Sequence, residues 1–154
     1  MLSLLASIPI FLFVTSGQYK KLWLIDGCNL MGYKGVPRSR EILIDKLSQI
    51  NSRDTEVIVV FDGRPDDETM SINRNGGCNF VVVQTMGAVT ADDFILQEIL
   101  DISKDPDKKS MTIHLVSGDR ALRQRCLAYR KTCADVINPA TFWNRYRPRL
   151  ANLK

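Results

Sequence analysis

The chain alternates short apolar runs with segments of helical periodicity from Lys21 onward, and this alternation constrains its fold more than any other feature. Four apolar runs, at residues 22–25, 57–61, 80–83 and 113–116, have the length and composition of strands buried in a parallel sheet. A shorter fifth run covers residues 135–137. Helical patterns separate or follow these runs at residues 38–51, 91–103, 121–129 and 139–147. The alternation predicts an α/β domain with a mainly parallel central sheet.

Length and composition limit the number of domains and the classes of site. With 154 residues, 45% of them hydrophobic and 25% charged, the chain has the size and mixture of one globular domain, which we place at residues 18–154. A single histidine, His114, and four cysteines without a C-x-x-C pair give no support for a Ser-His-Asp triad, a zinc ribbon or a redox dithiol. No glycine-rich phosphate loop follows a strand, so we expect no nucleotide cofactor.

The first 17 residues are treated separately because residues 1–14 are almost wholly apolar. This stretch is too short to span a bilayer, so we expect no transmembrane span. It is similar to the apolar part of a secretory signal but lacks the positively charged start, and it also lacks the arginines of a mitochondrial presequence. A targeting peptide, a hydrophobic anchor and an added first strand or helix all remain open.

Charge is distributed unevenly along a chain whose net charge is only +4. Residues 120–154 contain nine Lys or Arg residues and one acid, Asp135, so the remainder of the chain is acidic. An acidic body with a basic flank suits a polyanionic partner held beside a carboxylate cluster. Solvated helix faces are the alternative explanation.

Acidic residues follow the predicted strands at the points where ligands of open α/β sheets bind. Asp26 ends the first strand, Asp62 the second, Asp92 and Asp93 open the helix after the third, and Asp119 follows the fourth. Any one of them alone has an ordinary structural explanation, as a helix cap or an Asp-Gly turn. Together they predict a site for a divalent cation, because ionised carboxylates at one edge repel unless a cation neutralises them.

The ligand types indicate which ion to expect. Hard oxygen donors without histidine or thiolate favour Mg²⁺ or Mn²⁺, as one or two ions. The metal ligands expected are Asp26, Asp62, Asp92, Asp93 and Asp119.

Five short motifs, in this order and spacing, resemble the NYN domain of the PIN-like nucleases, most closely its YacP-like branch, over about residues 21–143. They are Leu24-Ile25-Asp26-Gly27-Cys28-Asn29, Arg38-Ser39-Arg40-Glu41, Val59-Val60-Phe61-Asp62-Gly63, Thr90-Ala91-Asp92-Asp93 and Ser117-Gly118-Asp119-Arg120. The sequence departs from the family's pattern at Cys28, where tyrosine is usual, and at Gly118, within what is commonly T-S-D. Neither departure removes a carboxylate.

The resemblance implies a Rossmann-like three-layer α/β/α domain and metal-dependent endonuclease activity on RNA. It makes Asp26, Asp92, Asp93 and Asp119 the catalytic residues that hold the metal during phosphodiester hydrolysis. Candidate substrate-binding residues surround them: Asn29, Arg38, Arg40, Thr90, Arg120 and Arg123. Arg145 to Arg149 would extend this track, and Trp143 and Tyr146 either stack on bases or, for Trp143, close the core.

The sequence is compatible with three candidate functions. The first is a metal-dependent endoribonuclease acting on RNA, free or in a ribosomal or ribonucleoprotein assembly. The second is a non-catalytic RNA-binding or ribonucleoprotein subunit that keeps the PIN-like fold. The third is a Mg²⁺-dependent phosphoryl-transfer domain, which the residues after the first strand fit poorly because they contain no D-x-D.

Overall fold

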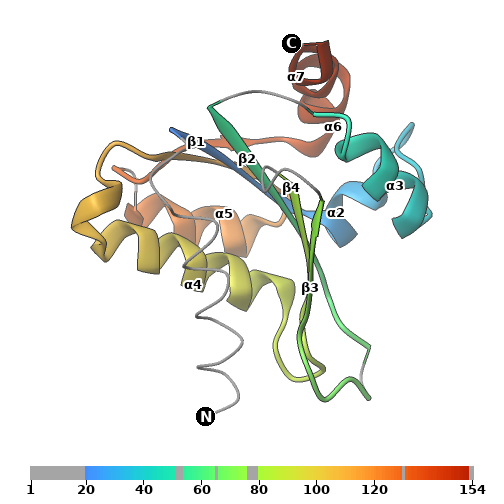
Figure 1. Ribbon diagram of the computed structural model, residues 1–154, viewed down its shortest axis with the longest axis horizontal. Coiled ribbons are helices and arrows are strands. Elements are labelled where there is room, and N and C mark those ends of the chain that lie inside the picture. Colours follow the sequence, from blue (N-terminus) through green and yellow to red (C-terminus); the bar gives the residue numbers. More distant parts are fainter. Residues whose placement is uncertain (1–19, 51–53, 65, 76–79, 130, 153–154) are drawn as a thin grey trace.

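The computed structural model describes residues 20–50, 54–64, 66–75, 80–129 and 131–152 (Figure 1). Its strands are β1 (Lys21–Asp26), β2 (Thr55–Phe61), β3 (Ser71–Asn75), β4 (Phe80–Gln84), β5 (Thr112–Val116) and β6 (Cys133–Ile137). Its α-helices are α2 (Gly27–Met31), α3 (Arg40–Leu47), α4 (Ala91–Lys104), α5 (Arg120–Cys126), α6 (Pro139–Thr141) and α7 (Arg147–Asn152). The apolar segment 1–17 lies outside the described residues.

The strands form one six-stranded sheet in the order β3-β4-β2-β1-β5-β6. All pairings are parallel except that of β3 with β4, which is antiparallel. The chain runs from β1 to β2 on one side and later returns through α4 to β5 on the other side of β1. This reversal of strand order places a ligand-binding crevice beyond the carboxyl end of β1.

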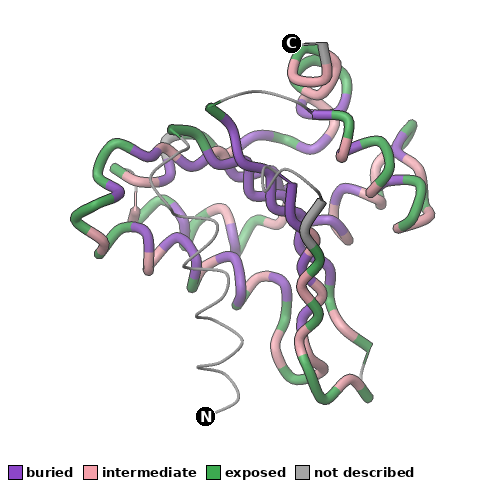
Figure 2. The backbone as a smooth tube through the Cα atoms, in the orientation of Figure 1, coloured by how far each residue is buried: buried purple, intermediate pink, exposed green. Residues whose placement is uncertain are grey.

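Side chains alternate between the two faces of the sheet, and each face carries its own apolar core. Leu24, Ile58 and Leu115 face α4 and α5, where they pack against Ile95 and Leu122. Residues of the opposite face, including Ile25, Val59 and Val116, pack with Leu43 of α3 and Phe142. Figure 2 shows the buried strands between partly exposed helices. The predicted α/β fold with its mainly parallel sheet and layered helices is confirmed.

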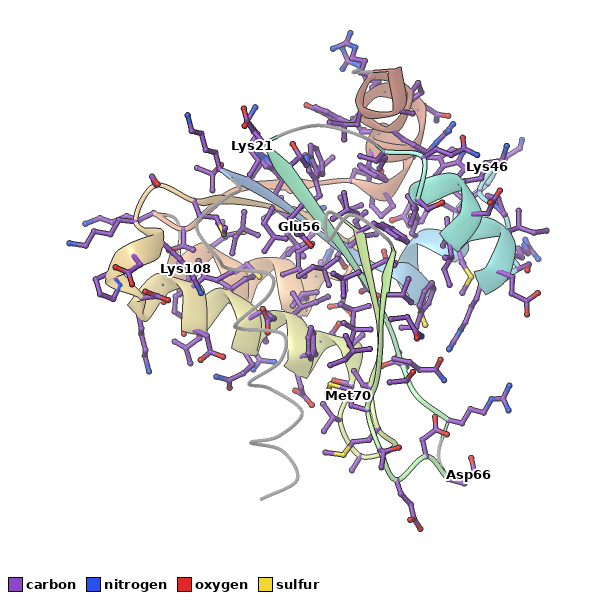
Figure 3. The ribbon with its side chains drawn as sticks, in the orientation of Figure 1. Lys21, Lys46, Glu56, Asp66, Met70 and Lys108 are labelled. Atoms are coloured by element: carbon purple, nitrogen blue, oxygen red, sulfur yellow. The ribbon has the colours of Figure 1, made fainter. Side chains whose placement is uncertain are left out.

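The expected strands and the helix at residues 91–103 are present with nearly the expected bounds, whereas other elements differ, among them the helix expected at residues 121–129, which ends at Cys126. The helix expected at residues 38–51 covers only Arg40–Leu47. The short α2 and the edge strand β3 were not expected. The β2–β3 connection, which carries Asp66 and Met70, projects from the body of the molecule (Figure 3).

The helix expected at residues 139–147 is divided into α6, a π-helical turn at Phe142–Tyr146, and α7. Pro148 has no backbone N–H and cannot donate to the preceding turn. In the wider turn the N–H of Arg147 donates to the carbonyl of Phe142. The Arg147 side chain satisfies the neighbouring carbonyl instead, with Nε 3.2 Å from the oxygen of Trp143 and the guanidinium 4.1 Å from the Trp143 ring centre.

Within the described part of the chain, no helix has the length and apolar character needed to cross a membrane.

Candidate active site at the carboxyl edge of the sheet

A cleft of about 300 Å³ opens at the carboxyl ends of the strands. Residues that follow β1, β2, β4 and β5, or end β1, line it: Asp26, Cys28, Asn29, Asp62, Thr90, Asp92 and Asp119. Four of the five predicted acidic ligands therefore share one cleft, although they lie up to 93 residues apart in the sequence.

Asp26 is the most deeply placed of these carboxylates, with 5% of its surface exposed. It ends β1 and caps α2, where its Oδ1 accepts from the backbone N–H of Asn29 at 3.3 Å. Its Oδ2 accepts from the hydroxyl of Ser117 at 3.2 Å. The Ser117 oxygen in turn accepts from the backbone N–H of Asp119 at 3.1 Å. Ser117 thus fixes the position of Asp26 relative to the loop that carries Asp119.

Asn29 ties the same two loops together, because its Oδ1 accepts from the N–H of Gly118 at 2.8 Å. A side chain at Gly118 would collide with the hydroxyl of Tyr33 and crowd this amide oxygen. The glycine in the Ser117-Gly118-Asp119 motif is therefore required by the close approach of Tyr33. Asp119 caps α5 by accepting from the N–H of Leu122 at 3.0 Å.

Asp62 joins the end of β2 to the start of α4, since its Oδ1 accepts from the N–H of Ala91 at 2.7 Å. Arg40 supports this loop from the other side. Its Nη2 donates to the backbone carbonyl of Asp62 at 2.9 Å and lies 3.8 Å from Cys28 Sγ. The guanidinium is 4.9 Å from the centre of the Phe61 ring. Arg40 therefore helps to hold the rim of the cleft in place.

Two adjacent acids at the N-terminus of α4, Asp92 and Asp93, make different contacts. Thr90 and Asp93 form a capping box, in which Thr90 Oγ1 accepts from the N–H of Asp93 at 3.1 Å and the Asp93 carboxylate accepts from the N–H of Thr90 at 3.4 Å. Asp92 lines the cleft, whereas Asp93 does not. The capping contacts give Asp93 a structural function, and its role as a metal ligand stays a prediction.

Burial and mutual repulsion shift the titration of the cleft carboxylates. Burial raises the pKa of Asp26 from 3.8 to about 6, the hydrogen bonds from Asn29 and Ser117 oppose this rise, and the negative charges of Asp92 and Asp62 add to it. The pKa of Asp92 is also raised, first by burial and then by nearby carboxylates, while Arg125 opposes the rise. The cleft therefore holds more negative charge than its protein surroundings neutralise.

The donors in the cleft fit a hard divalent cation by their chemistry, since they are carboxylate oxygens whose repulsion a cation would relieve. Within the described ranges, no group of three or more His, Cys, Asp or Glu side chains is placed to hold an ion by itself. Mg²⁺ or Mn²⁺ at this cleft stays a prediction, which rests on the chemistry of these carboxylate oxygens.

Other predicted residues lie outside the lining of the cleft. Arg38 and Arg120 are exposed and Arg123 is half-buried. Trp143 is buried in the core, while Tyr146 is exposed and its ring centre lies 5.4 Å from that of Trp23. Ser117, Tyr33 and the lining role of Cys28 were not expected from the sequence. Only the position of Ser117, two residues before Asp119, gave a signal that could have identified it.

Comparison with known proteins identifies a family and a solved structure of similar fold. The family model described as the YacP-like NYN domain matches residues 24–147, which is most of the chain. The crystal structure of a mutant of Rae1 (YacP) from Bacillus subtilis is similar with a TM-score of 0.58 and 20% identity, over 84% of this chain and 76% of that chain. At this identity the likeness establishes a shared fold. No curated protein matches the chain.

Proposed function

The chain belongs to the YacP-like NYN domain family, which has a nuclease-type, RNA-related fold, and from this premise we propose that it is a metal-dependent endoribonuclease. The observation that carries the proposal is the cleft in which Asp26, Asp62, Asp92 and Asp119 meet from four connections at the sheet's carboxyl edge. A module that only binds RNA gains nothing from repelling carboxylates, because they oppose the approach of phosphates.

We assign one or two Mg²⁺ or Mn²⁺ ions to Asp26, Asp92 and Asp119, directly or through water. Asp62 would join them as a further ligand, with its carboxylate held in place by the N–H of Ala91. When bound, the metal supplies Lewis-acid polarisation of the phosphate and of the attacking water. In the hydrolysis a water oxygen bonds to phosphorus and the bond from phosphorus to the leaving oxygen breaks.

The protein's own residues keep this arrangement in place during the reaction. Ser117 and Asn29 link the loops that carry Asp26 and Asp119, so neither carboxylate moves independently of the other. The contact between Asp62 and Ala91 fixes the start of α4 and therefore the position of Asp92. A site held by backbone and side-chain hydrogen bonds of this kind needs little reorganisation when the charge of the transition state develops.

RNA phosphates reach this site, in our proposal, across the exposed guanidinium groups near the cleft. Arg38 and Arg120 are exposed and free to move toward a phosphate, whereas Arg40 is already bonded to the carbonyl of Asp62. Arg38 and Arg120 therefore suit direct contact, and Arg40 suits positioning of the rim. Thr90 and Arg123 remain proposed substrate contacts.

The test is cleavage of end-labelled single-stranded and hairpin RNA by the full chain with Mn²⁺, Mg²⁺ or EDTA. Asp26→Asn and Asp92→Asn each remove one negative charge from the cleft, and Asp45→Asn removes one from the exposed face of α3 as the matched control. We expect metal-dependent cleavage by the wild type and by Asp45→Asn, and a loss of at least 100-fold in the two cleft variants, typical of removing an electrostatic group from an active site. Asp93→Asn tests the separate assignment of the capping residue.

A second function is favoured by one observation, namely that no three potential ligands in the described residues are placed to hold an ion. It is an RNA-binding or ribonucleoprotein subunit without catalysis. Binding of RNA without cutting, on naked RNA and on ribosomes and with every metal, would overturn the nuclease and establish this alternative.

A further inference from the structure

A groove of about 500 Å³ runs along α4, next to the cleft. α4 contributes Asp93, Leu96, Gln97 and Leu100, and the facing wall includes Arg125 and Tyr129. The two walls pack side by side beneath the sheet, with α4 and α5 adjacent in Figure 1. The volume is in the range of pockets that bind small molecules or single groups of a larger ligand.

The groove begins where the cleft ends. Asp92 lines the cleft and Asp93, the next residue, lines the groove. Arg125 belongs to the groove but lies close enough to Asp92 to act on its carboxylate. From Asp93 to Leu100 α4 rises about 10 Å, at roughly 1.5 Å per residue. The adjacency of Asp92 and Asp93 therefore puts the near end of the groove beside the cleft.

A further hollow, of about 420 Å³, continues from the groove around Tyr129. Tyr129 lines both, and the second one is also lined by Lys131 and by Leu127, whose side chain is 49% exposed. Tyr129 packs only partly against the core, so part of its surface is open to a ligand. An aromatic side chain between two hollows, beside exposed apolar surface and a lysine, is a stacking platform for a planar group.

Charge changes sign along this path. The cleft is acidic, the groove has one acid and one cation in Asp93 and Arg125, and the lining of the second hollow has Lys131 as its charged residue. The phosphates of a strand that continues beyond the cleft therefore come near the cations Arg125 and Lys131. The apolar side chains that line the groove and the second hollow suit the bases of that strand. A single RNA strand combines these two chemistries at this spacing.

We propose that the groove between α4 and α5 binds the RNA strand adjacent to the cut phosphodiester, with one base stacked on Tyr129 and phosphates beside Arg125 and Lys131. This inference rests on the proposed function, because it takes its direction from a phosphate in the cleft. It adds a substrate requirement, since a base can stack on Tyr129 only if it is unpaired. The groove therefore selects single-stranded RNA on one side of the cut.

The experiment measures the Kd of a labelled single-stranded RNA of about ten nucleotides by fluorescence anisotropy, with the full chain and Mg²⁺. All variants carry Asp26→Asn so that the RNA stays intact. Tyr129→Leu keeps an apolar side chain, Tyr129→Phe keeps the aromatic ring, and Ile42→Ala removes an exposed apolar side chain from α3, which packs on the other face of the sheet. Thermal unfolding of each variant establishes that it is folded.

We expect Tyr129→Leu to weaken binding roughly 5- to 100-fold, the range for losing one stacked base. Tyr129→Phe and Ile42→Ala should bind the RNA within about twofold of the protein that carries Asp26→Asn alone. Lys131→Gln should reduce the slope of log K against log salt by about one phosphate contact. An RNA with one abasic position should bind more weakly than the intact RNA to the protein that carries Asp26→Asn alone. Tyr129→Leu should bind the two RNAs equally.

Binding that Tyr129→Leu leaves unchanged, or a loss that Ile42→Ala reproduces, would overturn the groove assignment. Cleavage by the wild type, measured separately, keeps the two proposals distinguishable. An active nuclease with no effect at Tyr129 contradicts only the groove, and an inactive protein whose RNA binding depends on Tyr129 contradicts only the nuclease.

Discussion

The carboxylate of Asp26 is stabilised by two hydrogen bonds and destabilised by its surroundings. Asn29 and Ser117 donate to it, but burial and the charges of Asp92 and Asp62 act more strongly in the opposite direction and raise its pKa to about 6. The metal-free protein therefore retains a residue that weakens its fold at neutral pH. Such a residue is expected where function and stability compete.

We predict that Asp26→Asn makes the metal-free protein more stable at pH 7 while abolishing cleavage. Asparagine keeps an oxygen that can cap α2 and loses the charge. Because the pKa is raised in the folded state, the wild type loses stability as the pH rises from 3.8 to about 6, and the variant does not. We expect a gain of roughly 1–3 kcal/mol at pH 7 and none near pH 4.

Chemical denaturation in EDTA at the two pH values checks this prediction. Saturating Mn²⁺ should stabilise only the wild type, so that the wild type then has the larger free energy of unfolding. Equal gains at pH 4 and pH 7 would show that the substitution acts through packing and not through charge.

The contact between Gly118 and Tyr33 gives a second prediction at this scale. Gly118→Ala should destabilise the fold by about 1–3 kcal/mol, because the new methyl group meets the Tyr33 hydroxyl. Tyr33→Phe removes that hydroxyl, so the double variant should recover at least half of the loss. A double-mutant cycle of unfolding free energies measures the coupling. Strictly additive effects would contradict the contact.

The carboxylates of the cleft could be predicted from the sequence because each follows a recognisable strand. Their partners could not. Tyr33 lies in a loop after α2 and approaches Gly118, 85 residues away, only through the tertiary fold. For the same reason the sequence could not show that Asp92 faces the cleft while Asp93 caps the helix, since both fit the first turn equally well.

At the scale of elements, α4 places Asp92 of its first turn in the lining of the cleft and buries a carboxyl group, that of Glu98, on its core face. Glu98 is 3% exposed among apolar residues, and its Oε2 has no hydrogen-bond partner in the part of the chain that the structure describes. Burial raises its pKa to about 8, Asp101 adds to the rise and Lys108 opposes it. Lys108 follows the C-terminal end of α4, far from the loop at Asp66 (Figure 3).

We predict that Glu98→Gln removes a pH dependence of stability. The pKa in the fold lies above the ordinary value of 4.5, so the wild type loses stability as pH rises from about 4.5 to about 8, by up to about 1.4 kcal/mol per pH unit. Glutamine has no charge to desolvate. Urea unfolding at pH 5 and pH 8.5 should give a larger difference for the wild type than for the variant. Glu41→Gln, at an exposed position of α3, is the matched control.

Elements could be predicted where local pattern and tertiary environment agree. The parallel strands are continuous apolar runs because both faces are covered. β3 has the sequence SINRN and gains its strand conformation only from antiparallel pairing with β4, so no apolar run indicated it. The divided helix at the end of the chain could not be predicted for a similar reason. Its sequence pattern is helical, but Pro148 lacks a backbone N–H, and the wider turn before it is stabilised by the side chain of Arg147.

At the scale of the whole molecule, an acidic cleft lies at the sheet edge of a chain whose last 35 residues are strongly basic. In our proposal the basic part attracts RNA at long range, and the carboxylates of the cleft repel its phosphate at short range. A divalent ion converts that repulsion into attraction. Metal and RNA should therefore bind with positive coupling, and this coupling should depend on the cleft carboxylates and not on net charge.

We predict that this coupling determines whether the wild type or Asp92→Asn binds single-stranded RNA more tightly, and that adding Mg²⁺ reverses the order of their affinities. In EDTA, Asp92→Asn should bind single-stranded RNA more tightly than the wild type, by roughly fivefold, because one unneutralised carboxylate about 7 Å from a phosphate costs of order 1 kcal/mol. With Mg²⁺ the wild type should bind more tightly, because it retains the ion. Fluorescence anisotropy after rapid mixing, read before cleavage occurs, measures the RNA affinity of both proteins.

Asp45→Asn is the control, because it changes the net charge equally but lies outside the cleft. Its RNA affinity relative to the wild type should be the same in EDTA and in Mg²⁺. Equal effects of both variants in EDTA would attribute the repulsion to net charge, and the cleft would then not be where the phosphate binds.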